Sequence, residues 1–143
     1  MIFDKKYAGY YDLFNGGKDY GKECDFIEEI FRRFSGMPIK SVLDLGCGTG
    51  LHDKKLSERG YNITGLDISD EMIEIARARN PLSKFVVEDM SNFNLNKKFD
   101  AIICMFSALG YLTENKQFEE FFNSDSMHLK ENGLLILDVW NGL

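Results

Sequence analysis

The sequence is poor in features that would assign it to several common classes. Its three cysteines, Cys24, Cys47 and Cys104, are too few and too scattered for a disulfide framework or a zinc site, so we expect reduced, buried thiols. The longest clear apolar run covers only residues 101–106, whereas a membrane span needs about 20 apolar residues. The N-terminus lacks the apolar core of a signal peptide, and a cytoplasmic location is therefore expected.

Basic charge is also scarce. The chain has 17 Lys and Arg residues against 23 Asp and Glu residues, which gives a formal net charge of −6. The basic residues form only isolated pairs, at 32–33, 54–55 and 97–98. Nucleic acids and anionic membrane surfaces bind to concentrated positive charge, so we expect neither as a partner.

What the sequence does contain is a regular alternation of strand-like and helix-like segments. The spacing of apolar residues predicts strands at 41–45, 62–66, 84–87, 99–105 and 134–139, and helices at 18–35, 49–59, 70–79 and 114–129. This alternation predicts an α/β fold, an open, doubly wound, mostly parallel sheet with helices on both faces. We expect a single domain over 1–143, with an N-terminal lid and helix in 1–36 and a βαβ core in 37–143.

The stretch VLDLGCGTG at 42–50 reads as a buried strand that turns sharply and then begins a helix. Gly46, Gly48 and Gly50 remove the Cβ atoms at the turn, so a ligand can approach the backbone closely. Asp44 is unusual, because a carboxylate in a buried strand is costly unless a positive or hydrogen-bonding group meets it. The stretch predicts a ligand site at the carboxyl end of the first strand.

Acidic residues also follow the next two predicted strands. Asp67 ends the second strand about 20 positions after the glycine turn, where an acid accepts hydrogen bonds from ribose hydroxyls, and Asp89 follows the third strand. The turn does not have the G-x-G-x-x-G spacing of dinucleotide sites, since the third glycine comes one residue early. Asp44 would also repel a pyrophosphate, whereas it would attract a ligand that carries an ammonium and a sulfonium.

These stretches carry a family resemblance. The chain resembles a class I (Rossmann-like) methyltransferase that depends on S-adenosylmethionine (SAM). The resemblance rests on 42–50, on GLDIS at 65–69, on VEDM at 87–90, and on the fourth and fifth strands at 99–103 and 129–135, in the family's order. It implies that the chain transfers a methyl group from SAM to an acceptor, with S-adenosyl-L-homocysteine as the other product.

The resemblance also implies a set of cofactor contacts. The backbone of the glycine turn would cradle the methionine and ribose parts of SAM, Asp44 would help to hold the amino end, and Asp67 would accept both ribose hydroxyls. The cofactor-binding residues implied in this way are Tyr11, Asp44, Gly46, Cys47, Gly48, Gly50, Asp67, Ile68, Asp89, Met90 and Met105.

The remaining contacts concern the adenine and the methyl group. Ile68 and Met90 would sandwich the adenine, and Asp89 would accept from its exocyclic amine. Met105 would lie near the methyl group, and Tyr11 would approach the carboxylate from an N-terminal lid. Plain core packing stays open for the two methionines, because methionine fills irregular gaps.

The chemistry itself requires little from side chains. A sulfonium is already an activated leaving group, so transfer is promoted mainly by holding the reactants in line. The sequence shows no constellation that identifies a general base, and we name no catalytic residue and no metal ligand. His52 is expected to face the glycine turn or the surface, and His128 to be solvated at a helix end.

The acceptor is expected to be a small molecule, methylated on nitrogen, oxygen or carbon. A short match at 10–14 resembles the branch that includes amino-sugar N-methyltransferases. The family's sheet normally has seven strands, so we expect a chain truncated after the fifth strand, or one completed at the exposed edge of 134–139, as in a homodimer. Two alternatives stay open, a non-catalytic SAM-binding remnant or subunit and, less favoured, a nicotinamide-dependent oxidoreductase.

Overall fold

The computed structural model describes residues 19–105 and 112–138 of the chain. Its strands are β1 (Ser41–Leu45), β2 (Asn62–Asp67), β3 (Lys84–Val87), β4 (Phe99–Cys104) and β5 (Leu129–Leu137). Its helices are α2 (Tyr20–Phe34), α3 (Leu51–Glu58), α4 (Asp70–Arg79) and α5 (Asn115–His128). The predicted alternation is confirmed, and most predicted bounds agree with these within a residue or two.

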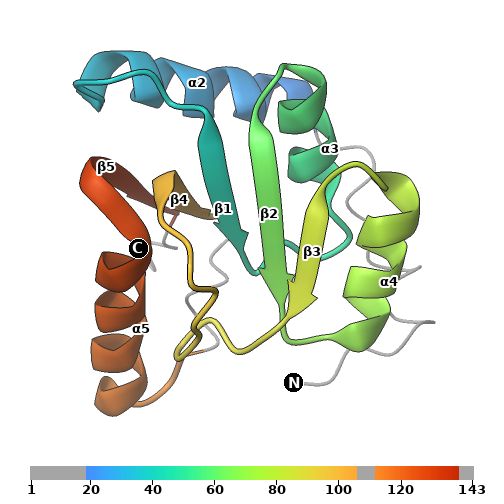
Figure 1. Cartoon of the computed structure of the whole chain (residues 1–143). Helices are drawn as coiled ribbons and strands as arrows, with labels where there is room; N and C mark the ends of the chain where they lie inside the picture. The colour runs from blue at the N-terminus through green and yellow to red at the C-terminus, as the bar shows by residue number, and fades with distance from the viewer. Residues whose placement is uncertain (1–18, 106–111, 139–143) are drawn as a thin grey trace, which may run out of the picture.

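The strands form one parallel sheet in the order β3-β2-β1-β4-β5 (Figure 1). The chain builds outward from β1 in one direction through β2 and β3, and then in the other through β4 and β5. The strand order therefore reverses at β1, which lies between β2 and β4. Open α/β sheets bind their ligands at the carboxyl ends of the strands at such a point. The predicted fold class is confirmed.

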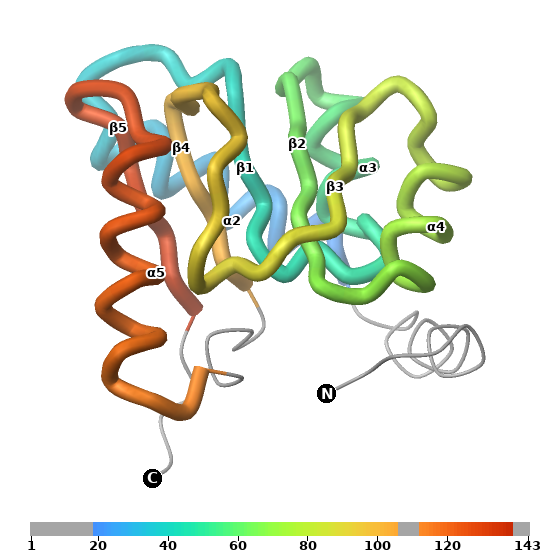
Figure 2. Tube along the Cα trace, turned by 60° about the horizontal axis from the view of Figure 1, so that its bottom comes forward, coloured from blue at the N-terminus to red at the C-terminus, as the bar shows by residue number. Residues whose placement is uncertain are grey.

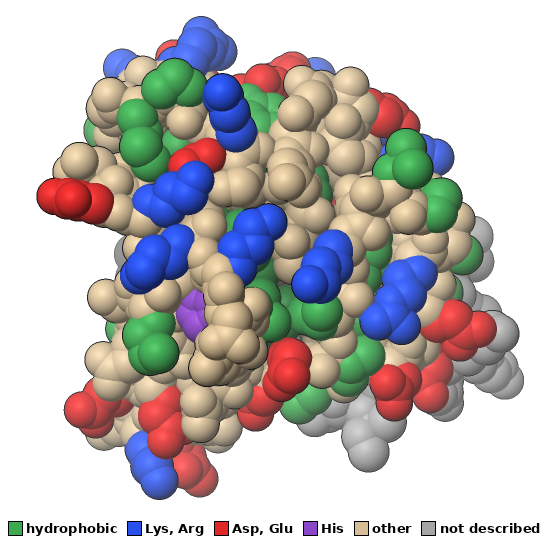
Figure 3. Space-filling model, in the orientation of Figure 1, with side chains coloured by type: hydrophobic (Ala, Val, Ile, Leu, Met, Phe, Trp, Pro, Cys, Tyr) green, Lys and Arg blue, Asp and Glu red, His purple; other side chains and the backbone are tan. Residues whose placement is uncertain are grey.

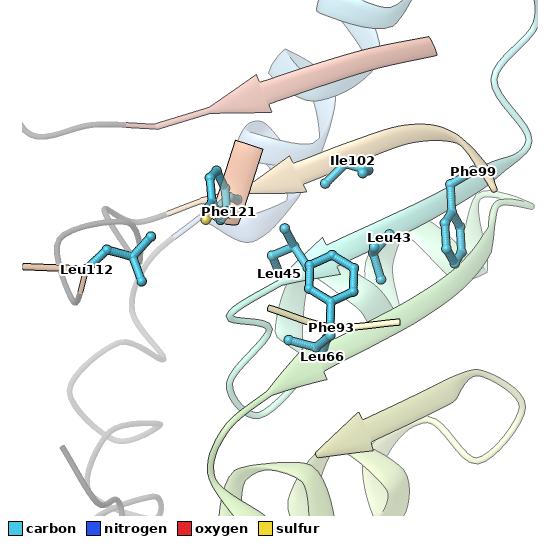
Figure 4. Close-up of a cluster of buried hydrophobic side chains, with 9 residues drawn as sticks. Leu43, Leu45, Leu66, Phe93, Phe99, Ile102, Leu112 and Phe121 are labelled. Atoms are coloured by element: carbon cyan, nitrogen blue, oxygen red, sulfur yellow. The ribbon is translucent and has the colours of Figure 1, made fainter. Parts of the chain in front are cut away.

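The residues of each strand alternate between two buried layers, as the pleat requires. Val42 of β1 packs with buried residues of α2 and α3, whereas Leu43 and Leu45 pack on the opposite face. Figure 4 shows part of that second layer, which is made of Leu43, Leu45, Leu66, Phe93, Phe99, Ile102, Cys104, Leu112 and Phe121. The alternation places Asp44 on the same face as Val42, toward α3.

Helices cover both faces of the sheet. The apolar residues of α2, α3 and α4 pack on one face, and Phe121 of α5 packs on the other with Phe93 from the segment after β3. In Figure 2, α5 lies in front of the sheet and α2 behind it. None of the helices in 19–105 and 112–138 is both long enough and apolar enough to cross a membrane.

The end of α5 differs from the prediction. His128 is 2% exposed, so the expectation of a solvated side chain is wrong. Its Nδ1 donates to the Ser124 carbonyl at 2.7 Å, and its Nε2 accepts from the Leu95 N–H at 2.9 Å. The strand β5 begins at Leu129, whereas the sequence predicts a start at 134. The β4–β5 register is irregular between Phe99 and Ala101, and the turn at Asn132 lies opposite this irregularity.

The first residues of β1 and β4 are tied together by a carboxylate. Asp100 Oδ2 accepts from the backbone N–H groups of Lys40 at 2.8 Å and Ser41 at 2.9 Å, and Ser41 Oγ accepts from the Asp100 N–H at 2.9 Å. Lys130 Nζ lies 3.1 Å from Asp100 Oδ1. Burial opposes the ionised form, but the two backbone bonds and Lys130 outweigh it and lower the pKa of Asp100 to about 2.

Basic side chains cross the middle of the face shown in Figure 3, with acidic ones gathered along its lower edge. Several lysines are engaged by the protein itself. Besides the Lys130–Asp100 pair, Lys98 Nζ donates to the Met127 carbonyl at 3.1 Å. Lys97 lies 5.0 Å from the centre of the Phe99 ring. The ammonium groups of Lys97, Lys98 and Lys130 therefore interact with an aromatic ring, a carbonyl and a carboxylate of the protein itself.

Candidate functional site

The glycine turn follows β1 and has the backbone conformation that glycine allows. Gly46, Gly48 and Gly50 have φ angles of 70°, 59° and 78°, a region that other residues rarely adopt. The N–H groups of Gly46 and Cys47 both donate to the Leu66 carbonyl, at 2.8 and 3.0 Å. The turn is thus anchored to the end of β2, and each of its three glycines is required by the path of the chain.

Asp67 bridges the glycine turn and the start of α4. Its Oδ2 accepts from the Gly48 N–H at 2.9 Å and its Oδ1 accepts from the Ser69 N–H at 2.9 Å. Burial raises the pKa of this carboxyl, and the hydrogen bonds from Ser69 and Gly48 oppose the rise. Asp67 therefore lies where the sequence predicts, at the carboxyl end of β2, with its carboxyl group directed at the turn.

The residues after β2 and β3 form the next part of the same edge. Ile68 is 60% exposed although its side chain is apolar. Asp89 is also exposed, and its Oδ1 accepts from the N–H and the hydroxyl of Ser91 at 2.9 and 2.7 Å. Met90 is half-buried, with its sulfur 4.0 Å from that of Cys104. The ends of β2 and β3 thus present one apolar, one acidic and one thioether side chain at this edge of the sheet.

Two further predicted site residues are Met105 and Tyr11. Met105 is half-buried and packs against the cluster on the α2 face of the sheet. Tyr11 lies outside the described residues. The part of the site that the structure brings together therefore comes from the ends of β1, β2 and β3.

The neighbour of Asp44 is a second acid, Asp53, whereas the sequence predicts a positive or hydrogen-bonding group there. Asp53 of α3 is 0% exposed and Asp44 is 3% exposed, and their carboxyl groups lie within hydrogen-bonding reach of each other. Burial raises the pKa of Asp44 well above its ordinary value, and the charge of Asp53 raises it further. Burial likewise raises the pKa of Asp53 to about 7.

Asp53 was missed by sequence reasoning, although a signal exists. Asp53 stands three positions before Leu56, which is fully buried, so both lie on the face of α3 that packs on the sheet. An acid on the inner face of a short helix, next to a strand that already holds Asp44, predicts contact between the two carboxyl groups.

His52 is buried toward α2, which corrects the expectation that it faces the turn or the surface. Its Nε2 lies 2.7 Å from Glu23 Oε2, and its ring makes an edge contact with Tyr20 at 4.9 Å between centroids. From the other side, Arg79 of α4 donates to the Thr49 carbonyl at 2.8 Å. The glycine turn and the first residues of α3 are thus held from α2 and from α4.

Gly65 sets how closely the layers approach beneath the turn. A Cβ atom at this position would lie 2.5 Å from the Phe85 ring and 2.9 Å from Cys47 Sγ. Its absence lets β2 and β3 hold the turn close to the sheet. Burial also raises the pKa of Cys47, so its thiol stays protonated and serves as a packing group.

The arrangement has a defined chemistry. It offers a backbone cradle without Cβ atoms, a carboxylate at the end of β2 for hydroxyl groups, and buried acids behind the cradle. Within 19–105 and 112–138 no three His, Cys, Asp or Glu side chains gather in a way that could hold a metal ion. These residues fit a nucleoside with a cationic tail better than they fit a pyrophosphate, which Asp44 and Asp53 would repel.

Comparison with known proteins agrees with this chemistry. Residues 42–133 match the family described as "Methyltransferase domain". The chain therefore belongs to this family of methyltransferase domains. It is 34% identical over 135 residues to a dTDP-3-amino-3,6-dideoxy-alpha-D-glucopyranose N,N-dimethyltransferase of Streptomyces fradiae, covering 93% of this chain and 52% of the relative. It is also 34% identical over 142 residues to a dTDP-3-amino-3,4,6-trideoxy-alpha-D-glucopyranose N,N-dimethyltransferase of Streptomyces venezuelae, covering 97% of this chain and 59% of the relative.

Solved structures show the same fold. The crystal structure of Streptomyces venezuelae DesVI matches with a TM-score of 0.87 at 34% identity, covering 94% of this chain and 57% of that one. The SAM-bound amino pentose methyltransferase CalS10 of Micromonospora echinaspora matches with a TM-score of 0.83 at 29% identity, covering 99% of this chain and 58% of that one. The chain thus spans little more than half the length of the relatives it matches.

Proposed function

We propose that this chain is the SAM-binding part of a methyltransferase that acts on a small molecule. The observation that carries the proposal is Asp67, held by the N–H groups of Gly48 and Ser69 at the carboxyl end of β2. A carboxylate fixed in this way is poised to accept hydrogen bonds from the two hydroxyls of a ribose. The likeness to CalS10, which is described as bound to SAM, supports this choice of nucleoside.

The chain's own residues would bind and orient the cofactor. The glycine turn holds the methionine and ribose parts, and the neighbouring Asp44 provides negative charge for the amino end. Ile68 and Met90 enclose the adenine, while Asp89 accepts from its exocyclic amine. Bound SAM supplies an activated methyl group, so the contribution of the protein is to hold donor and acceptor in line and to exclude water.

The remaining predicted contacts belong to the same proposal. Met105 follows β4, next to the carboxyl end of β1, and would limit the space near the methyl group. Tyr11 would approach from the N-terminal part, 1–36, of a single domain whose core is 37–143. Both assignments rest on the family resemblance, and substitution of either residue should weaken SAM binding less than substitution of Asp67 does.

The acceptor that we propose is the amino group of a sugar nucleotide. Two relatives that match almost all of this chain are named as N,N-dimethyltransferases of dTDP-linked amino sugars. The acidic balance of the chain and the local engagement of Lys97, Lys98 and Lys130 disfavour a nucleic-acid acceptor. The test offers the protein SAM together with a panel of dTDP-amino sugars and other small amines, and it detects the S-adenosyl-L-homocysteine that transfer produces. Transfer to none of the panel would favour a non-catalytic SAM-binding subunit.

The cofactor is tested first, by calorimetry with SAM, S-adenosyl-L-homocysteine and NAD. We expect the first two to bind and NAD not to bind. Asp67→Asn should weaken SAM binding at least tenfold, because charge-assisted hydrogen bonds contribute roughly 1.5–3 kcal/mol each. Asp70→Asn, an exposed acid in the first turn of α4, is the matched control and should bind as the wild type does. Unchanged affinity in Asp67→Asn, or tight binding of NAD alone, would contradict the proposal.

We also propose a cytoplasmic protein that forms a homodimer through β5. Within the described sheet β5 pairs only with β4, and its apolar residues 134–137 are only half-buried. An unpaired strand edge is a template for another strand. Light scattering after size exclusion should give twice the chain mass, and Leu135→Lys should lower it to the mass of one chain. A single-chain mass at all concentrations would contradict this proposal.

A further inference from the structure

His52 is buried beside the glycine turn, and none of the cofactor contacts assigned above uses it. It lies on the first turn of α3, two residues after Gly50, the last glycine of the turn. The whole residue is only 6% exposed. Burying a polar side chain costs free energy unless the side chain is hydrogen-bonded, so the partners of His52 decide what the residue does.

The groups that meet His52 come from the first turns of α2, which lies beside α3 (Figure 1). Its Nε2 lies 2.7 Å from Glu23 Oε2, a distance at which the ring N–H donates to the carboxylate. The Tyr20 ring meets the imidazole edge-on, with 4.9 Å between centroids, and Cys24 Sγ lies 3.9 Å from the His52 carbonyl oxygen. Both the side chain and the backbone of His52 are therefore held by α2.

The start of α3 needs such support. The helix has only eight residues, and its N-cap is Gly50, which provides no side-chain hydrogen bond. A short helix without a capping side chain is marginal by itself and depends on packing. The glycines before it have many accessible conformations, so neighbouring elements must fix the one that the turn adopts. The contact with α2 acts where the turn becomes the helix.

A second contact joins the same two helices at the other end of α3. Arg59 directly follows α3, and its Nη1 lies 2.8 Å from Asp25 Oδ1 and also pairs with Glu28. Its Nη2 donates to the Gly21 carbonyl at 3.1 Å. Both contacts thus hold α3 against α2, but of the two only the contact of His52 adjoins the glycine turn.

We propose that Glu23 and His52 are positioning residues for SAM, and that their contact fixes the glycine turn in the conformation that binds the cofactor. Neither side chain touches the cofactor, and the effect passes from α2 through His52 to the backbone of Gly50. The inference rests on the proposed function, because SAM is the ligand for which the turn is positioned. Without the contact, the turn populates other conformations, and the apparent affinity falls with the fraction that stays competent.

Calorimetry with SAM tests the contact by a double-mutant cycle. Glu23→Ala and His52→Ala should each weaken SAM binding by about fivefold or more. The double variant should bind no more weakly than His52→Ala, because both changes remove the same contact. Glu23→Gln keeps an acceptor oxygen and should recover most of the affinity that Glu23→Ala loses. Unchanged affinity in Glu23→Ala, additive losses in the double variant, or no recovery in Glu23→Gln would overturn the inference.

Arg59→Gln is the matched control, because it loosens the other contact between α2 and α3. If these contacts only stabilised the fold, Arg59→Gln and Glu23→Ala would weaken SAM binding in proportion to their loss of stability in urea. We expect Arg59→Gln to be less stable than the wild type and yet to bind SAM as the wild type does. A loss of SAM affinity in Arg59→Gln equal to that in Glu23→Ala would contradict a positioning role.

Hydrogen exchange followed by mass spectrometry gives a readout that needs no ligand. In the empty protein, Glu23→Ala should speed the exchange of backbone amides in residues 46–52, whereas Arg59→Gln should leave their exchange unchanged. Equal exchange of this segment in Glu23→Ala and the wild type would overturn the inference. Failure of the wild type to bind SAM would instead overturn the proposed function, and the exchange experiment would still decide whether Glu23 and His52 fix the turn.

Discussion

Asp100→Asn should destabilise the protein without touching the cofactor site. The carboxylate accepts two backbone N–H groups at the start of β1, and it lies 3.1 Å from Lys130 Nζ. An asparagine has nearly the same shape and keeps one acceptor oxygen, but it has no charge. The change therefore removes the electrostatic part of the β1–β4 tie and leaves the packing in place.

The magnitude follows from the titration of the group. The pKa of Asp100 falls from 3.8 to about 2 on folding. Each unit corresponds to 1.36 kcal/mol, so the charged form contributes about 2 kcal/mol at neutral pH. Because the folded pKa is lowered, this stabilisation is complete above the unfolded pKa near 4 and is lost as pH falls toward 2. Lys130→Gln should cost less than about 1 kcal/mol, since that lysine is half-exposed.

Urea denaturation followed by circular dichroism at pH 7, 5, 4 and 3 measures the effect. We expect Asp100→Asn to be about 2 kcal/mol less stable than the wild type at pH 7 and 5, and the gap to narrow at pH 3. Glu131→Gln, an exposed acid next to Lys130, is the control and should track the wild type at every pH. Equal stability of Asp100→Asn and wild type at pH 7, or a gap independent of pH, would refute the reasoning.

Three further substitutions test the packing around the site, each by the same denaturation measurement. Gly65→Ala should cost about 1–3 kcal/mol, because its methyl group would overlap the phenylalanine ring that Gly65 faces; no loss would show that the ring moves aside freely. Ser69→Ala should cost about 1 kcal/mol, since the hydroxyl caps α4 by accepting from the Met72 N–H. His128→Leu should cost about 1–3 kcal/mol by leaving the half-buried Leu95 N–H without its acceptor, and a neutral result would contradict that contact.

The sequence predicts the fold well where local signals and the global pattern agree. β1 and β3 begin and end at the predicted residues, because short apolar runs between turn residues leave little choice. Ser69 caps α4 at the predicted start of the helix, and Met72, Ile73 and Ala76 are buried on its inner face. In each case the determinant lies within a few residues of the position that it decides.

The failures have a common physical cause. The surroundings of His128 are decided by Leu95, and those of His52 by Glu23, which are distant in the sequence. Asp53 is the exception, because its partner Asp44 stands just before the glycine turn that leads into α3, and the buried face of that helix already indicated the contact. Periodicity indicates which face of a helix is buried, but it does not indicate which polar group of a neighbouring element contacts that face. Pairings of buried polar groups therefore require the three-dimensional arrangement.

The order of the strands has a consequence for how this protein folds. Residues 41–87 are contiguous and contain β1, β2 and β3, so that half of the sheet closes through short connections. The other half depends on Asp100 reaching Lys40 and Ser41 from 60 and 59 positions away. Closing longer loops costs more entropy, and we therefore expect the half that carries the glycine turn, Asp67 and Asp53 to assemble first. The docking of β4 and β5 would then be the late step, and the ligand side of the domain would take shape before the sheet is complete.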